Sequence, residues 1–96
     1  MFSRISLIRF DVERLDKAHR MWLSVSVPAA LAQKSCRKMR GFRSLDDPSL
    51  MIIVSEWDSR EDADAYMYSP AHDRMMEGYG TLIQGIVGRY PCALIE

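Results

Sequence analysis

The side chain best suited to acid–base chemistry in this sequence is His72. It lies on the apolar stripe of a predicted helix, one turn before Met75 and Met76. A histidine titrates near neutrality, so it can take a proton from an activated phenol or quinol, or bind a haem iron. In the alternative interpretation, His72 is a partly buried structural residue that is hydrogen-bonded to a neighbouring polar group. No acid or second ligand residue has a defined spacing to His72, so both roles stay open.

Two aromatic residues that precede His72 are candidates for the wall of a ligand site. Trp57 ends an apolar, β-branched run, and Tyr66 follows in the next predicted helix. Trp57 can stack on a flat ring and Tyr66 can form a hydrogen bond with a ligand oxygen. Both can instead be plain core, because aromatic residues at strand ends and on helix stripes often serve packing alone. The surrounding surface is rich in aromatic and thioether groups, namely Tyr66, Tyr68, Tyr79, Met67, Met75 and Met76.

The motifs that hold nucleotides, flavins and metals in proteins are missing from the sequence. It has no Gly-rich phosphate loop, no HxxEH cluster, no CxxC pair and no nucleophile elbow. We therefore expect no cofactor and no metal site. Cys36 and Cys92 are too few and too distant for a disulfide framework, and we expect two buried free thiols. A disulfide between Cys36 and Cys92 of two subunits is the alternative.

Length and charge limit the classes of partner. The 96 residues are enough for one domain, with 48% hydrophobic and 27% charged residues. A formal net charge of zero argues against nucleic acid as a partner. No apolar run approaches the roughly 20 residues that span a membrane, and the N-terminus lacks a signal peptide. We expect a cytoplasmic protein that does not bind membranes.

These candidate residues must be positioned by a series of short elements. The first strand is predicted over Phe2–Phe10, with apolar residues on both faces, as in a central strand. An amphipathic helix follows from Asp11 to about Ser24, and Pro28 either kinks it or begins a further turn. The core-facing residues of this helix are Val12, Leu15, Ala18, His19, Trp22 and Val25. A β-hairpin is predicted next, with strands over 34–45 and 50–57 and a turn at 46–49.

The second half of the chain contains two capped helices and a last strand. Ser59 with Asp62 forms a capping pattern, so a short helix is expected over 59–68. Ser69-Pro70 repeats the signal and begins a longer helix that runs to about Gln84 and ends at Gly85. The last strand is predicted over 86–95, and Pro91 confines it to a sheet edge or a bulge.

This order of elements predicts the fold class. β-α-β-β-α-β is the ferredoxin-like arrangement, an α+β fold with an antiparallel sheet. Its helices cover one face of the sheet and leave the other face bare. Two such sheets packed face to face would cover both, so we expect a homodimer.

Three stretches of the chain carry a resemblance to a known family. They are Ser44–Pro48, Val54–Asp62 and Ser69–His72. In element order, residues 1–96 resemble a single domain of the antibiotic biosynthesis monooxygenase (ABM) family, and the sequence motifs are specific from about Leu45 to Met76. The resemblance implies a dimeric α+β barrel whose pocket lies between the helices and the sheet. Members include cofactor-independent oxygenases of polycyclic aromatic and quinol substrates, haem-degrading enzymes, and proteins without a known activity.

The resemblance also suggests which residues line the pocket. Trp57 matches a tryptophan that lines the pocket of the cofactor-free oxygenases. Ile53 stands where these enzymes have an asparagine, and Ala63 where they have a tyrosine. Met76 stands near their arginine, and where haem-degrading members have a ligand histidine. We expect the substrate pocket to be lined by Trp57, Ile53, Met76 and Trp22, with His72 and Tyr66 as candidate catalytic residues.

Three functions follow in order of preference. The first is a cofactor-independent monooxygenase that acts on a flat aromatic or quinol-type small molecule. The second is a non-catalytic dimer of the same fold that binds a small apolar ligand or regulates another process. Apolar residues at positions 53, 63 and 76 favour this second function. The third is a haem-binding or haem-degrading protein.

Overall fold

The fold is an α+β sandwich of one antiparallel sheet and one layer of helices. The structure, a computed structural model, describes residues 1–95. Its strands are β1 (Phe2–Phe10), β2 (Cys36–Arg43), β3 (Leu50–Trp57) and β4 (Ile83–Ala93). Its helices are α1 (Leu15–Met21), α2 (Val27–Leu31), α3 (Arg60–Met67) and α4 (Pro70–Tyr79). The predicted ferredoxin-like order of elements and the antiparallel sheet are confirmed.

The sheet has the order β2-β3-β1-β4, and each neighbouring pair is antiparallel. β1 is central, as its two apolar faces predicted. β4 is an edge strand, which explains how it tolerates Pro91, a residue without a backbone N–H. The strand β2 is shorter than the predicted range 34–45. Its ends turn away from the ladder because Gln33–Ser35 and Ser44–Ser49 are occupied by turn hydrogen bonds.

The first helical segment is longer and less regular than predicted. A 3-10 turn at Val12–Arg14 leads into α1, and a π-helical turn at Trp22–Ser26 joins α1 to α2. In the π turn the Val27 N–H donates a hydrogen bond to the Trp22 carbonyl oxygen. The helical path therefore continues past Pro28 and does not end at Ser24.

The π turn also changes the face that the helix buries. One extra residue per turn rotates the stripe, so Ser26 is 2% exposed whereas Val25 is 42% exposed. Val12, in the 3-10 turn before α1, is also exposed. The prediction that Val12 and Val25 face the core is wrong, and it holds for Ala18 and Trp22.

The second helical segment begins as predicted and ends earlier. The Ser59 hydroxyl accepts from the Asp62 N–H, and the Ser69 hydroxyl accepts from the His72 N–H, which confirms both N-caps. α4 stops at Tyr79 rather than near Gln84, because Gly80 adopts a φ of 54° that few other residues tolerate. β4 consequently begins at Ile83, three residues before its predicted start, and ends at Ala93.

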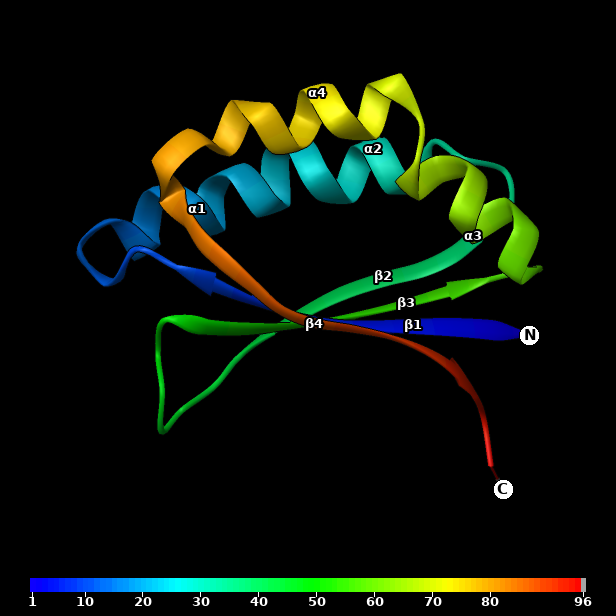
Figure 1. Cartoon of the computed structure of the whole chain (residues 1–96), viewed down its shortest axis with the longest axis horizontal. Coiled ribbons are helices and arrows are strands. Elements are labelled where there is room, and N and C mark those ends of the chain that lie inside the picture. The colour runs from blue at the N-terminus through cyan, green and yellow to red at the C-terminus, as the bar shows by residue number, and fades with distance from the viewer. Residues whose placement is uncertain (96) are drawn as a thin grey trace.

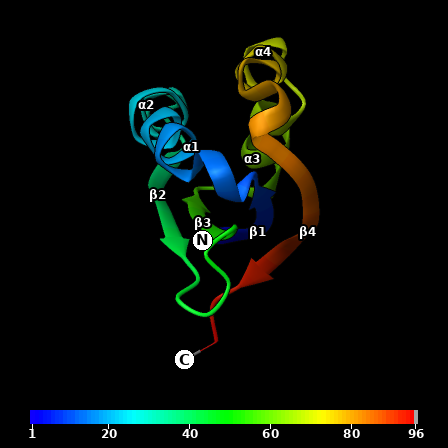
Figure 2. The same cartoon turned by 90° about the vertical axis from the view of Figure 1, so that its left-hand side faces the viewer.

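All helices lie on one face of the sheet. In Figures 1 and 2, α1 and α2 lie above β2, and α3 and α4 lie above the β4 side. The core between the layers has two parts. One contains Ile8, Phe10, Ala18, Trp22, Met51, Ile53, Tyr79 and Leu82. The other contains Ala30, Cys36, Trp57, Ala63 and Tyr66.

The opposite face of the sheet carries no helix (Figure 2). The register places seven apolar side chains there, from all four strands: Ile5, Leu7, Phe42, Leu50, Ile52, Val54 and Tyr90. Phe42 and Tyr90 are each 50% exposed. β4 bends away from the sheet toward this side, so the C-terminal end projects from it (Figure 1). In residues 1–95, no helix is long and apolar enough to cross a membrane.

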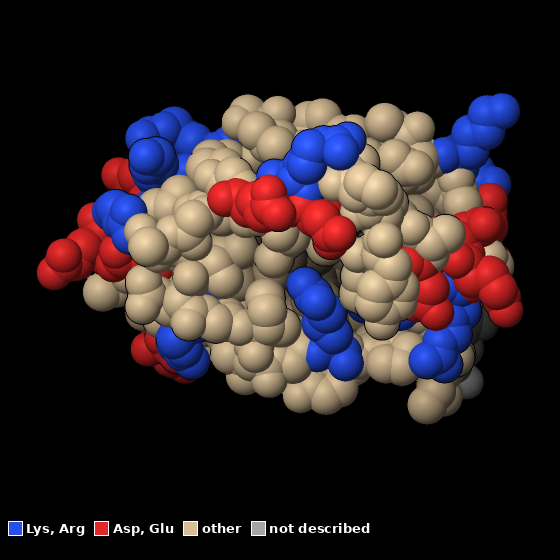
Figure 3. All heavy atoms as spheres, turned by 45° about the horizontal axis from the view of Figure 1, so that its top comes forward, with Lys and Arg blue, Asp and Glu red and all other residues tan. Residues whose placement is uncertain are grey.

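The charged side chains of the helical side are mixed in sign. In the view of Figure 3, lysine and arginine alternate with aspartate and glutamate, and neither sign covers a large continuous area. Arg37 pairs with Asp58 at 2.6 Å, and Lys38 lies 3.7 Å from Glu56, so these two basic residues of β2 are compensated by neighbouring acids.

Candidate functional site

A cavity of about 70 Å³ lies between the helices and the sheet. This is far more than the ~10–15 Å³ that one ordered water needs. All six residues proposed from the sequence line it: Trp22, Ile53, Trp57, Tyr66, His72 and Met76. They come from the π turn, β3, α3 and α4, so the fold brings together residues up to 54 positions apart. The rest of the lining is also mainly apolar, with Ile8 and Phe10 on the floor.

Tyr66 contributes a polar group to this apolar cavity. The Ser59 cap orients α3 so that the Tyr66 ring meets Trp57, with centroids 5.6 Å apart and an angle of 31° between the planes. Tyr66 is only 8% exposed, and its hydroxyl has no hydrogen-bond partner among the described residues. Burial, followed by the nearby Cys36, raises the pKa of Tyr66, so the hydroxyl remains a proton donor. A buried donor without a partner is a place where a ligand oxygen would be stabilised.

His72 stands beside Tyr66 in the cavity wall. Its ring meets the Tyr66 ring edge-on, with centroids 5.3 Å apart and an interplanar angle of 82°. No hydrogen bond from the imidazole is present within residues 1–95, so the structural role with a polar partner is not what we observe. Burial and then Arg89 lower the pKa of His72, and Asp73 opposes them. The imidazole is therefore neutral at pH 7 and free to accept a proton.

A second tyrosine of the cavity is fully satisfied. The Tyr79 hydroxyl lies 2.5 Å from the Ser26 hydroxyl, which also lies 3.2 Å from the Met75 sulfur. The Tyr79 ring stacks on Phe10 with centroids 5.8 Å apart. Sequence reasoning placed Tyr79 on the aromatic surface but missed Ser26, because only the π turn rotates that serine inward. Tyr79 is thus structural, whereas Tyr66 has an unused hydroxyl.

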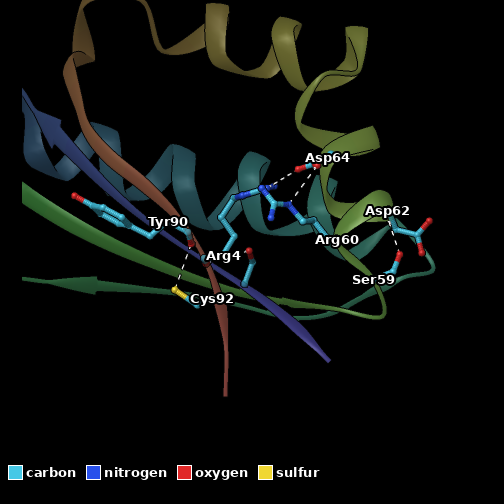
Figure 4. Close-up of polar contacts among 8 residues, drawn as sticks. Arg4, Ser59, Arg60, Asp62, Asp64, Tyr90 and Cys92 are labelled. Atoms are coloured by element: carbon cyan, nitrogen blue, oxygen red, sulfur yellow. Dashed lines mark hydrogen bonds and ion pairs between the residues drawn. The ribbon is translucent and has the colours of Figure 1, made fainter. Parts of the chain in front are cut away.

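Arginine residues on the sheet complete the polar side of the cavity. Arg4 is 9% exposed, and its guanidinium lies 2.5 Å from Asp64 of α3, which Arg60 also approaches at 3.8 Å (Figure 4). Arg89 of β4 lines the same cavity. Sequence reasoning missed both. The alternation that placed Phe2, Ile8 and Phe10 on one face of β1 also places Arg4 there, so the face of Arg4 could have been predicted from the sequence. The face of Arg89 could not.

The described residues offer no cluster for a metal ion. Nowhere in residues 1–95 do three His, Cys, Asp or Glu side chains come together in a way that could hold one. Cys36 and Cys92 are both free thiols on opposite edges of the sheet. Cys36 is buried as expected, next to Trp57 on the helix-covered face, whereas Cys92 is only partly buried because it pairs with Ser3 on the helix-free face.

The antibiotic biosynthesis monooxygenase family model matches residues 1–78. The chain belongs to this family. The matched region runs from β1 to the last turn of α4 and includes positions 53, 57, 63 and 76, while all of β4 lies beyond it. No curated protein matches the chain in sequence.

Solved structures share the ABM fold. A Bordetella bronchiseptica protein named for this family has a TM-score of 0.87 and 12% identity, over 99% of this chain and 97% of that one. A Deinococcus radiodurans protein named for it has a TM-score of 0.84 and 12% identity, covering 100% and 94%. A Mycobacterium tuberculosis protein has a TM-score of 0.78 and 19% identity, covering 99% and 95%. Likeness at such low identity supports the fold alone.

Proposed function

We propose that this ABM protein binds a flat aromatic or quinol-type molecule in the cavity and oxygenates it without a bound cofactor. The observation that carries the proposal is the meeting of Tyr66 and His72 in an otherwise apolar space. Tyr66 offers a hydroxyl without a hydrogen-bond partner among the described residues, and His72 offers a neutral imidazole. Together they suit a substrate that presents an oxygen and an acidic C–H bond on one ring system.

The reaction begins with loss of a proton from the substrate. His72 accepts a proton from a ring methylene, and the negative charge spreads onto the substrate oxygen, which Tyr66 holds by a hydrogen bond. The resulting carbanion reduces dioxygen. One oxygen atom bonds to the ring carbon, the second C–H proton is lost, and the O–O bond breaks. The methylene and O₂ thereby become a carbonyl group and water.

The rest of the cavity excludes water and orients the ring. Trp57 and Phe10 contribute aromatic rings to the lining, and Ile53 and Met76 contribute further apolar groups. An apolar wall of this kind strengthens the electrostatic interactions of the polar pair. In the proposed reaction the substrate carbanion itself reduces oxygen, and the wall contributes orientation.

Oxygen consumption with anthrone as substrate tests this proposal. The wild-type protein should consume oxygen above the protein-free background, and His72→Ala should lower the rate by about 100-fold or more. His19→Gln, in α1 outside the cavity lining, is the matched histidine control and should keep the wild-type rate. Oxygen uptake no faster than background, or full activity in His72→Ala, would contradict the proposal.

The pH dependence adds a check on the role of His72. Only the neutral imidazole can accept a proton, and its pKa lies below the ordinary 6.5. The rate should therefore fall to half of its plateau value only below pH 6.5. A rate that already halves between pH 7.5 and 6.5 would assign the proton transfer to another group.

The second candidate function is ligand binding without turnover. Ile53, Ala63 and Met76 all lie in the cavity wall and offer no polar atoms to a reaction intermediate. Thermal stabilisation by anthrone without oxygen uptake would favour this function over the first. Haem binding is the third, and a haem titration without a Soret shift would dismiss it.

We also propose that two copies assemble through the helix-free face of the sheet. The seven apolar side chains on that face form a contiguous surface across all four strands. Exposed apolar surface of this kind is characteristic of association sites. Packing two such faces would produce the barrel implied by the family resemblance, with the two cavities on its outer sides.

A further inference from the structure

The edge strand β4 directs a cation into the cavity. Gly88 pairs with Leu7 and Ile86 pairs with Ile8, so Val87 is an extra residue, a β-bulge. Ile86 shares the helix-covered face with Ile8. Simple alternation from Ile86 would turn Arg89 to the opposite face, but the bulge returns Arg89 to the helix-covered face, opposite Ser6. Bulges often redirect side chains next to functional sites.

The guanidinium groups of Arg4 and Arg89 therefore lie near each other. Arg4 pairs with Pro91 in the register, and Arg89 lies two residues before Pro91 on the same face of the sheet. Long side chains at such diagonal positions are within reach of each other. Partial burial at the cavity, followed by repulsion from Arg4, lowers the pKa of Arg89, while Tyr68 acts in the opposite direction.

The acids nearby do not compensate Arg89. Asp64 is bound by Arg4 and shared with Arg60 (Figure 4). No ion pair within residues 1–95 involves Arg89. Arg89 is exposed and also lines the cavity, so it stands where the cavity meets solvent. The cavity therefore has positive charge at one end and the unpartnered Tyr66 hydroxyl within.

We propose that Arg89, with Arg4 beside it, forms an anion subsite, and that the ligand of this cavity is an aromatic molecule with an ionised oxygen, a carboxylate or an enolate. A guanidinium binds such an oxygen by charge-assisted hydrogen bonds, in a fork that matches a carboxylate. In the reaction proposed above, the same subsite would act together with the Tyr66 hydroxyl on the oxygen that becomes negative when His72 takes the proton. This inference rests on the proposed aromatic ligand but not on turnover.

Equilibrium binding of matched probes tests the subsite. Benzoate and benzamide have nearly the same shape and differ in charge, and 2-naphthoate and 2-naphthamide form a larger pair. The indole N–H resonances of Trp22 and Trp57, both in the cavity wall, report binding in NMR titrations. Wild-type protein should bind each acid more tightly than its amide, and rising salt should reduce this preference.

Variants at position 89 separate charge from shape. Arg89→Met should weaken binding of the acids about tenfold, the loss expected for a charge-assisted hydrogen bond, and leave the amides within twofold. Arg89→Lys should recover part of the loss. Arg20→Met, an exposed α1 arginine outside the cavity lining, is the matched control and should behave as wild type.

The possible results distinguish this inference from the proposed function. Equal weakening of acid and amide by Arg89→Met, or an unchanged preference for the acid, would overturn the anion subsite while aromatic binding stands. Absence of binding by all four probes would overturn both. A charge preference that depends on Arg89, with no oxygen uptake from anthrone, would support the subsite and reject the oxygenase.

Discussion

At the scale of single residues, Tyr66 and Tyr79 form a natural comparison within one cavity. Both are buried, at 8% and 4% exposure, but only Tyr79 has a hydroxyl partner, in Ser26. Removing an unpartnered buried hydroxyl relieves a desolvation cost, whereas removing a bonded one leaves its partner unsatisfied. Tyr66→Phe should therefore maintain or raise the free energy of unfolding, by up to about 1 kcal/mol, and Tyr79→Phe should lower it by about 1 kcal/mol.

Denaturant unfolding of the two variants measures this difference, with each variant serving as the control for the other. Tyr66→Phe should also weaken binding of a ligand that uses the hydroxyl, so that stability and affinity change in opposite directions. An equal loss of stability in both variants would mean that Tyr66 has a partner in solution. Gain of stability with loss of binding is the signature of a residue retained for function.

The cavity residues differ in how far the sequence could identify them. Trp57, Tyr66 and His72 follow helix caps and an apolar run, so their faces could be read from spacing alone. Arg89 could not be found this way, because a single extra residue in β4 decides which face it occupies. Ser26 was missed for the same reason in a helix, where the π turn rotates the buried stripe. Local irregularities depend on tertiary packing and leave no periodic signal.

At the scale of elements, two glycines compete as the end of α4: Gly80 follows the observed end, and Gly85 was predicted to end the helix. Gly80 has a φ of 54°, whereas Gly85 lies in β4 without a positive φ, and an added Cβ would meet no atom within 4 Å at either site. Gly80→Ala should lower the free energy of unfolding by about 1–2 kcal/mol, the cost of a left-handed φ for a residue with a Cβ. Gly85→Ala should be neutral or slightly stabilising.

Thermal unfolding of both variants tests where the helix ends. The result expected from the sequence alone is the reverse, with Gly85 as the sensitive position. Caps at Ser59 and Ser69 were predictable because a side chain bonds its own backbone within three residues. The choice between Gly80 and Gly85 was not predictable, because both glycines fit a helix end. The pairing of Ile83 with Phe10 in the sheet decides between them.

At the scale of the whole molecule, the sheet has two apolar faces and the helices cover only one. The proposed dimer would bury the other. Phe42 on β2 and Tyr90 on β4 stand on that face at half exposure, so charging them costs a monomer little. If the two copies pack through this face, Phe42→Glu and Tyr90→Glu should each convert the protein from twice the protomer mass to the protomer mass.

Sedimentation equilibrium over a range of concentrations measures the mass of each variant. Leu31→Glu on α2 is the matched control, because Leu31 is similarly exposed, at 48%, but lies in the helix layer. It should leave the mass unchanged. A dimer that survives both sheet variants and dissociates in Leu31→Glu would place the contact on the helices. Since the cavity lies between the helices and the sheet, that result would also put the partner next to the ligand site and require the cavity's access to be reconsidered.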